Sequence, residues 1–300
     1  MPAVPAAASP SRRLTGIQAM ALSALFFSLM SLAVKFAGQR IPAMELVFTR
    51  AIIVSLLAVI DIRRRGISLG GQPALMLFVR GLVGFVALAC FYWSVVRIPL
   101  AEATAIHFTN PVFTALIAAA FLGERLRPRE FALALVGLLG VAIMVRPAGL
   151  FGGTGAALPM LPVVSSLSAS VLAAVAYVIV RHLRSYDAMV VVFYFAGISS
   201  VAAAPLMIPG FVWPRGSEWL VLLAVGVTTF GGQIFLTLGL QRERAARATT
   251  AGYLQIPFAS LWGYLVFRDV PTMWTVTGAA VIVSSTLLLT RRTIVADPDG

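Results

Sequence analysis

Residues 73–96 read PALMLFVRGLVGFVALACFYWSVV, a run of mostly apolar side chains that contains a single charged residue, Arg80. A helix rises about 1.5 Å per residue, so about 20 mostly apolar residues are enough to cross the hydrocarbon core of a bilayer. The length and composition of this stretch therefore predict a membrane-spanning helix.

Nine further stretches have the same character. The ten predicted spans lie near residues 15–37, 43–62, 73–96, 100–122, 130–146, 161–181, 188–209, 218–240, 247–267 and 271–290. With 60% hydrophobic residues, 11% charged residues and a mean hydropathy of +0.95, the chain has too little polar surface to cover a water-soluble domain. Alternating-polarity strands typical of a membrane barrel are absent, and Gly and Ala are abundant within the spans. The predicted fold is an all-α integral membrane protein.

The ten spans divide into two sets of five. Because five is odd, a second copy of the unit enters the bilayer from the opposite side, so we expect two inverted repeats around a central cavity. A shift of 145 residues superimposes the sets, placing Phe48 on Phe193 and Gly81 on Gly226. The predicted organisation is a cytoplasmic tail (1–14), a first repeat (15–146), a periplasmic linker (147–160), a second repeat (161–290) and a cytoplasmic tail (291–300).

The placement of basic residues predicts the orientation. With the N-terminus in the cytoplasm, the inner side receives 15 of the 23 Lys and Arg residues and the outer side 6, which favours both termini inside. The net charge of +12 is spread over short loops rather than a basic domain, so nucleic acid is not an expected partner. Cys90, the one cysteine, lies within the third span, which excludes an intrachain disulfide. Short loops suit a bacterial inner membrane.

Polar residues within the spans are candidates for a substrate site, because burying them in hydrocarbon is costly unless they face a partner, water or a substrate. They lie at the middle of the fourth span (His107, Asn110, Pro111) and at equivalent depth in the ninth (Tyr253, Gln255, Pro257). A proline within a helix removes a backbone hydrogen bond and frees a carbonyl, so Pro111 and Pro257 predict two broken helices at a central site. The alternative is that both prolines only shape helix packing.

The eighth span adds Gln233, which follows two glycines and can both donate and accept hydrogen bonds. It is a candidate substrate contact, with a hydrogen bond between helices as the alternative. Aromatic side chains are expected to form apolar walls of the cavity, although an interfacial aromatic belt also explains such residues. These wall residues are Phe27, Tyr92, Trp93, Tyr177 and Tyr253; the expected polar contacts are His107, Asn110, Gln233 and Gln255.

Two arginines and three glutamates complete the set of notable charges. Arg50 and Arg80 each start about 12 Å inside the membrane, so we expect each to bond to a helix end or a carboxylate. Glu45 and Glu102, both near the outer surface, are candidate partners for Arg50 or for a proton. Glu124 precedes the fifth span, where a carboxylate stabilises a helix N-terminus.

Enzyme chemistry finds little support in the sequence. The two histidines, His107 and His182, lack an H-E-x-x-H pattern or cysteine partners, and no Walker or Gly-x-Ser-x-Gly element is present. We therefore expect no catalytic residues, no metal site and no cofactor. The expected partners are a small-molecule substrate and the lipid bilayer, and we expect a monomer.

The chain resembles the ten-helix EamA-type members of the drug/metabolite transporter superfamily over roughly residues 15–290. The resemblance rests on the five-plus-five duplication and on Arg50, Pro111, Pro257 and Gly123-Glu124. The second copy has Arg268-Asp269 in place of the usual Gly-Glu, which departs from the family pattern. The resemblance implies an inner-membrane carrier whose third, fourth, eighth and ninth helices, with the first and sixth, surround a central cavity.

The resemblance also implies a function, because characterised relatives export amino acids, aromatic ones among them. We expect export of an amino acid or similar small metabolite by alternating access, driven by a solute gradient, protons or the membrane potential. Uptake of S-adenosylmethionine or another metabolite is an alternative, because direction follows gradients rather than fold. The residues are also compatible with an intramembrane enzyme that uses His107 as a base, and with a membrane scaffold that has no solute path.

Overall fold

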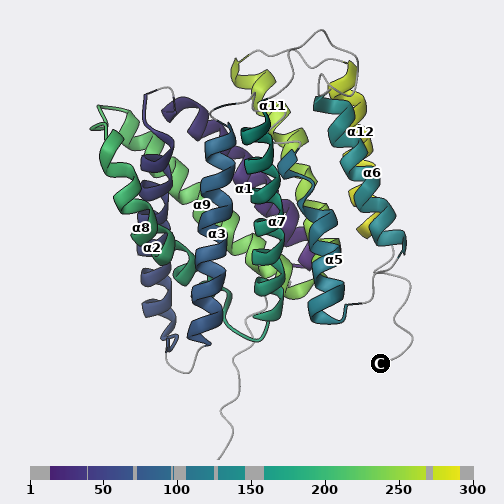
Figure 1. The fold of residues 1–300 in the computed structure, drawn as a ribbon, viewed down its shortest axis with the longest axis horizontal. Helices are drawn as coiled ribbons and strands as arrows, with labels where there is room; N and C mark the ends of the chain where they lie inside the picture. The colour runs from purple at the N-terminus through teal and green to yellow at the C-terminus, as the bar shows by residue number, and fades with distance from the viewer. Residues whose placement is uncertain are drawn as a thin grey trace, which may run out of the picture.

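The computed structural model describes residues 14–38, 40–69, 73–95, 97, 106–124, 128–145, 159–267 and 273–290. Within these ranges the chain forms helices and no strands, and the helices stand side by side in a bundle (Figure 1). They are α1 (Gly16–Ala37), α2 (Ala43–Arg65), α3 (Ala74–Val95), α5 (Asn110–Leu122), α6 (Pro128–Val145), α7 (Met160–His182), α8 (Ala188–Met207), η1 (Ile208–Gly210), α9 (Glu218–Arg242), α10 (Ala245–Ala251), η2 (Gly252–Leu254), α11 (Gln255–Phe267) and α12 (Met273–Thr290).

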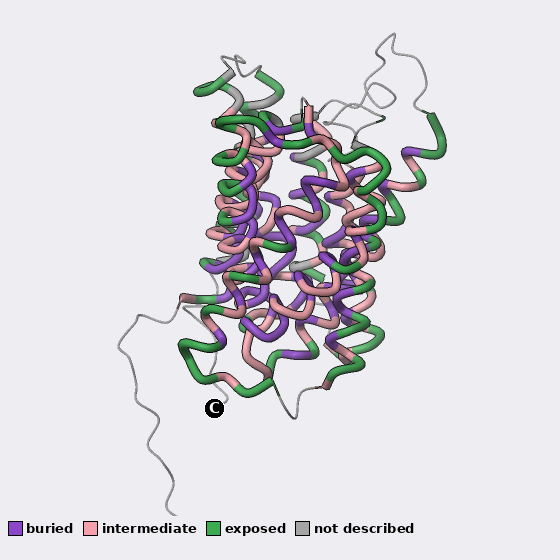
Figure 2. Tube along the Cα trace, turned by 90° about the vertical axis from the view of Figure 1, so that its left-hand side faces the viewer, coloured by how far each residue is buried: buried purple, intermediate pink, exposed green. Residues whose placement is uncertain are grey.

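Six of these helices are long and apolar enough to cross a membrane: α1, α2, α3, α7, α8 and α9. Helix α5 and the apolar segments Phe131–Gly140 and Val276–Ser285 are shorter. Large apolar side chains, among them Leu56, Phe78 and Leu220, are exposed on the bundle, whose exposed positions are green in Figure 2. Lipid rather than water suits such a surface. An all-helical membrane protein is therefore confirmed, whereas the number of ten spans stays a prediction.

Helices from the two halves of the chain pack in antiparallel pairs: α1 with α9, α2 with α8, α3 with α7, and α6 with α12 (Figure 1). Hydrogen bonds fix the directions. Ser94 Oγ, near the end of α3, donates to the carbonyl oxygen of Pro162 near the start of α7 at 2.9 Å. Arg65, at the end of α2, forms an ion pair with Asp187, the N-cap of α8. The bundle is thus held together chiefly by contacts between the two halves.

Glycines on α9 allow its close approach to α1. A Cβ added at Gly232 would lie 2.8 Å from the ring of Phe27. A Cβ added at Gly239 would lie 2.6 Å from the side chain of Met20 and 3.1 Å from the carbonyl oxygen of Gly16. Lipid tails are as apolar as the side chains, so helices in a bilayer associate through close van der Waals packing, which small residues permit.

The start of α1 is held by a capping box. The Oγ1 atom of Thr15 accepts a hydrogen bond from the backbone N–H of Gln18 at 3.2 Å, and Gln18 Oε1 accepts from the backbone N–H of Thr15 at 2.9 Å. Replacing Thr15 with alanine is expected to lower the free energy of unfolding by about 1 kcal/mol, measured by denaturant titration in micelles. Thr15→Ser keeps the hydroxyl and should match the native protein. An equal loss in both variants would contradict this assignment.

The predicted tails and the predicted linker fall almost entirely outside the described residues, apart from Leu14 and Pro159–Met160. Helix α7 begins at Met160, the last residue of the predicted linker. The proposed boundaries of the tails, linker and repeats remain predictions.

Candidate functional site

Ile106 and His107 are helical, and a turn at Phe108 and Thr109 separates them from α5. The ring centroid of His107 is 4.5 Å from that of Phe91 on α3, and its Nδ1 atom is buried without a hydrogen-bond partner among the described residues. Asn110 Nδ2 donates to the carbonyl oxygen of His107 at 3.0 Å. Helix α5 begins at Asn110, and Pro111 occupies its first turn, where the missing N–H costs no helical hydrogen bond. The helical conformation is therefore interrupted at Phe108 and Thr109, three and two residues before this proline.

The corresponding segment of the second half has the same construction. Helix α10 ends at Ala251, η2 follows, and α11 begins at Gln255 with Pro257 in its first turn. Tyr253, in η2, is fully buried, its hydroxyl has no partner among the described residues, and its ring centroid lies 5.8 Å from that of Phe108. In this structure Tyr253 is a packed interior side chain and Gln255 is partly exposed.

The remaining predicted wall residues lie apart from one another. Tyr92 is buried in a cluster with side chains of α2 and α8. The ring of Trp93 lies 3.9 Å below the guanidinium carbon of Arg97. Phe27 packs on Gly232 of α9, and Tyr177 packs against a buried apolar cluster at one end of the bundle. Among the described residues, the structure therefore brings His107 and Asn110 together, and separately Phe27 and α9; a cavity shared by the whole predicted set stays a prediction.

A second group of polar side chains surrounds a small cavity between α2, α8 and α9. The cavity has the size of about one water molecule. Four polar residues line it: Arg50 is 4% exposed, Ser199 1%, Thr229 2% and Gln233 7%. The Oγ atom of Ser199, Oγ1 of Thr229 and Oε1 of Gln233 are buried without partners among the described residues. Phe195 forms part of the apolar wall.

The prediction that Arg50 and Arg80 bond to a carboxylate or a helix end is wrong for the described residues. The hydrogen bond of Arg50 among the described residues is a weak one, from Nη1 to the Met30 sulfur at 3.8 Å. Arg80 lies over the ring of Phe195, 4.4 Å from its centroid, and its Nε and Nη1 atoms have no partners there. Glu45 instead accepts a hydrogen bond from the backbone N–H of Val212. Glu102, the other candidate partner of Arg50, lies outside the described residues.

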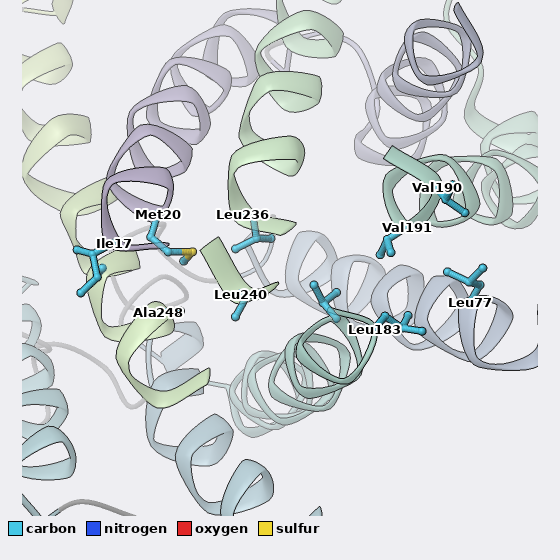
Figure 3. Close-up of a cluster of buried hydrophobic side chains, with 11 residues drawn as sticks. Ile17, Met20, Leu77, Leu183, Val190, Val191, Leu236, Leu240 and Ala248 are labelled. Carbon is cyan, nitrogen blue, oxygen red and sulfur yellow. The ribbon is translucent and has the colours of Figure 1, made fainter. Parts of the chain in front are cut away.

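The interior of the bundle is filled by apolar side chains at the end where α1 begins and where α7 and α9 finish, which we call the closed end (Figure 3). Leu183 is 1% exposed there, and Leu240 is fully buried. The members of this cluster are Ile17, Met20, Leu77, Val180, Leu183, Val190, Val191, Leu236, Leu240, Ala248 and Ala251.

Glu124 joins the two halves at the closed end. Its Oε1 atom accepts from Arg181 Nε on α7 at 2.8 Å, and its Oε2 atom accepts from the backbone N–H of Ala245, the first residue of α10, at 3.1 Å. Arg181 Nη1 also donates to the carbonyl oxygen of Gln241 at 2.8 Å. The sequence placed Glu124 at the start of the following helix, α6. Its carboxylate in fact holds the start of α10.

Sequence reasoning missed several members of these groups. Thr229 precedes Gln233 by four residues, a spacing that puts both on one helix face and was a usable signal. Ser199 and Phe195 have the same spacing on α8. No sequence signal places Phe91 against His107, because their contact depends on how α3 packs.

Comparison with known proteins decides the family. The model of the EamA-like transporter family matches residues 14–146 and again residues 160–291. The chain belongs to the EamA-like transporter family. The EamA-like chain is accordingly a multi-pass membrane transporter that acts on a small molecule, and the resemblance to the drug/metabolite transporter superfamily is confirmed.

Named relatives of this EamA-like transporter cover nearly its whole length. It is 36% identical to the pseudopaline exporter CntI of Pseudomonas aeruginosa over 92% of this chain and 96% of the relative. It is 30% identical to human solute carrier family 35 member G1 over 88% of this chain and 75% of the relative. The chain also superposes on a crystal structure with a TM-score of 0.79 at 24% sequence identity. The superposition covers 94% of this chain and 99% of the chain in the crystal structure, which shows that the two share a fold.

Proposed function

We propose that this EamA-like protein exports a small metabolite, foremost amino acids including aromatic ones, across the bacterial inner membrane by alternating access. The observation that carries the proposal is the reciprocal packing of the two halves, which meet through antiparallel helix pairs. Polar side chains that have no hydrogen-bond partner in the described part of the chain lie inside the bundle, at His107 on one side and at the cavity beside Gln233 on the other. A carrier needs such groups to face its cargo.

The packing supports two inverted repeats. In this scheme each helix of the first half has a counterpart in the second: α1 corresponds to α7, α2 to α8, α3 to α9, and α6 to α12. When every helix is replaced by its counterpart, the contact of α1 with α9 becomes the contact of α7 with α3, which the structure also has. The α2–α8 and α6–α12 contacts map onto themselves and are antiparallel, as a two-fold axis in the membrane plane requires. With α5 as the fourth span and α10, η2 and α11 as the ninth, this scheme gives ten crossings.

The arginines of the described chain support an orientation with the closed end in the cytoplasm. Basic side chains concentrate on the cytoplasmic side of membrane proteins. The closed end has many of them at the ends of α2, α7 and α9, and the opposite end has few. The arginines at the ends of these helices or just after them at the closed end are Arg63, Arg64, Arg65, Arg181, Arg184, Arg242 and Arg244. Those at the opposite end are Arg40, Arg97 and Arg215. In this orientation both ends of the described chain lie inside.

The chemistry of the interior favours a cargo with an apolar body and hydrogen-bonding ends. His107 stands beside the rings of Phe91 and Phe108, at 4.5 and 6.2 Å between centroids. Amino acids, above all aromatic ones, combine an apolar body with polar ends. The similarity to a pseudopaline exporter makes pseudopaline the second cargo to test.

Transport into sealed vesicles tests the proposal directly. Purified protein in proteoliposomes is expected to move radiolabelled phenylalanine, or another amino acid, down an imposed gradient faster than empty vesicles do. Flux no faster than in empty vesicles for amino acids and for pseudopaline would reject the proposed cargo. Conversion of substrate by detergent-solubilised protein, without a sealed compartment, would favour an enzyme instead.

Replacing His107 with leucine is expected to slow this flux roughly ten- to hundredfold, because a hydrogen bond to a polar cargo is lost in a water-poor site. The flux assay in proteoliposomes measures the change. His182→Leu is the matched control, since His182 is exposed at the end of α7 and should leave the flux unchanged. Equal flux in His107→Leu and native protein would remove His107 from the transport path.

A further inference from the structure

The cavity between α2, α8 and α9 holds a positive charge without a counter-ion. No ion pair joins Arg50 to a carboxylate anywhere in the described part of the chain, and its one polar contact is the sulfur of Met30 at 3.8 Å. A thioether is a weak hydrogen-bond acceptor. A buried guanidinium normally pairs with an anion, because removing its charge from water is costly.

The uncharged neighbours of Arg50 are also unsatisfied. The hydroxyl oxygens of Ser199 and Thr229 and the amide oxygen of Gln233 line the same cavity, are buried, and have no partners in the described ranges. A water molecule would satisfy some of these groups but would leave the charge of Arg50 uncompensated. Three helices thus direct one cation and three hydrogen-bonding side chains at a shared space, which is the chemistry of an anion site.

Among anions, a carboxylate matches these groups. Its two oxygens accept from the planar guanidinium fork of Arg50 and have lone pairs left for hydroxyl donors. The hydroxyls of Ser199 and Thr229 can donate, and the amide of Gln233 can donate or accept. The cavity itself is small, but Met30 is an unbranched, flexible side chain that can withdraw from Arg50 when an anion enters.

A second buried cation strengthens the site. The guanidinium carbon of Arg80 lies 4.4 Å from the ring centroid of Phe195, and Phe195 lines the same cavity as Arg50. Arg80 also has no carboxylate partner among the described residues. Two uncompensated cations in a region of low dielectric raise the affinity for a negative charge.

We infer that the Arg50 cavity is the subsite that holds a carboxylate group of the exported metabolite, with Ser199, Thr229 and Gln233 as hydrogen-bond partners. This inference rests on the proposed export function for the identity of the cargo, but the anion site itself can be tested without transport. It lies between α2, α8 and α9, away from the His107 segment, so cargo would be held at two places.

The test is ligand-dependent thermal stabilisation of the purified full-length protein in nanodiscs, with acetate as the probe and acetamide and chloride as comparisons at constant ionic strength. Acetate is expected to raise the Tm, whereas acetamide and chloride are not. Arg50→Gln is expected to weaken acetate binding roughly ten- to hundredfold, the effect of losing charge-assisted hydrogen bonds. Arg63→Gln, the same substitution at an exposed position of α2, should bind acetate as the native protein does.

Equal stabilisation by acetamide, equal stabilisation by chloride, or unchanged acetate binding in Arg50→Gln would each overturn the inference. If Arg50→Gln does not fold, Thr229→Val and Ser199→Ala retain the charge and should still weaken acetate binding several-fold; unchanged binding in both would also overturn it. Failure of the proposed function gives a different result. Native protein would then bind acetate through Arg50 but carry no amino acid or pseudopaline in proteoliposomes.

Discussion

Gly239→Leu is expected to lower the free energy of unfolding by about 3 kcal/mol or more and to abolish most of the folded protein. An added Cβ would meet the Met20 side chain at 2.6 Å and the Gly16 carbonyl oxygen at 3.1 Å. The side chain of Met20 can move, but the backbone of α1 at Gly16 moves only if the two helices separate. The Tm in detergent and the monodisperse fraction on size exclusion measure the effect.

Gly197→Leu is the matched control for this substitution. Gly197 lies in the middle of α8, and no atom lies within 4 Å of a Cβ built there. Leucine has a higher helix propensity than glycine by roughly 1 kcal/mol, so this variant should be as stable as the native protein or more stable. Similar Tm values for Gly239→Leu and Gly197→Leu would show that close packing between α1 and α9 does not limit stability.

Glu124→Gln is expected to open the closed end and to slow transport. Glu124 and Arg181 have side chains only 14% and 12% exposed, so the neutral amide leaves a nearly buried charge without its counter-ion. Removing one partner of a buried pair costs about 3–5 kcal/mol, and about 1.4 kcal/mol shifts an equilibrium tenfold. In alternating access the closed end must open once in each transport cycle. The variant should therefore raise the equilibrium ratio of open to closed protein by at least about tenfold.

Cysteine labelling measures that opening. Leu240→Cys in a Cys90→Ala background places one thiol in the buried cluster of the closed end, because Cys90 is the chain's only cysteine. A membrane-impermeant maleimide should then react at least about tenfold faster when Glu124→Gln is added. Asp61→Asn removes a more exposed carboxylate from the i,i+4 pair with Arg65 on α2 and should not change the rate. Equal rates in all three proteins would contradict a closing role for Glu124.

The candidate site was only partly predictable from the sequence. His107, Asn110 and Gln233 are polar residues in apolar spans, and hydropathy alone selects them. The same reasoning predicted that Arg50 bonds to a carboxylate or a helix end. The sequence does not reveal which side chains surround Arg50, and the described ones that line its cavity include no carboxylate. Tyr253 and Tyr92 were expected to line a cavity, but the structure buries them against apolar neighbours. An aromatic residue at a given depth faces a cavity or a neighbouring helix depending on helix rotation, which composition does not specify.

Sequence alone was enough to predict a helical membrane protein, because span length and hydropathy are local properties that the bilayer thickness constrains directly. The resemblance to the drug/metabolite transporter superfamily came instead from the duplication and from motifs such as Arg50 and Pro111. Which helices meet became clear from the folded structure. The pairing of α2 with α8 and α9 surrounds Arg50 with Ser199, Thr229 and Gln233, and the crossing of α5, α7 and α10 gives Glu124 its partners. Such contacts join residues that are far apart in the sequence, 57 positions for Glu124 and Arg181 and 121 for Glu124 and Ala245. They depend on the three-dimensional fit of helix surfaces, and in lipid that fit is set by close packing, which hydropathy does not describe.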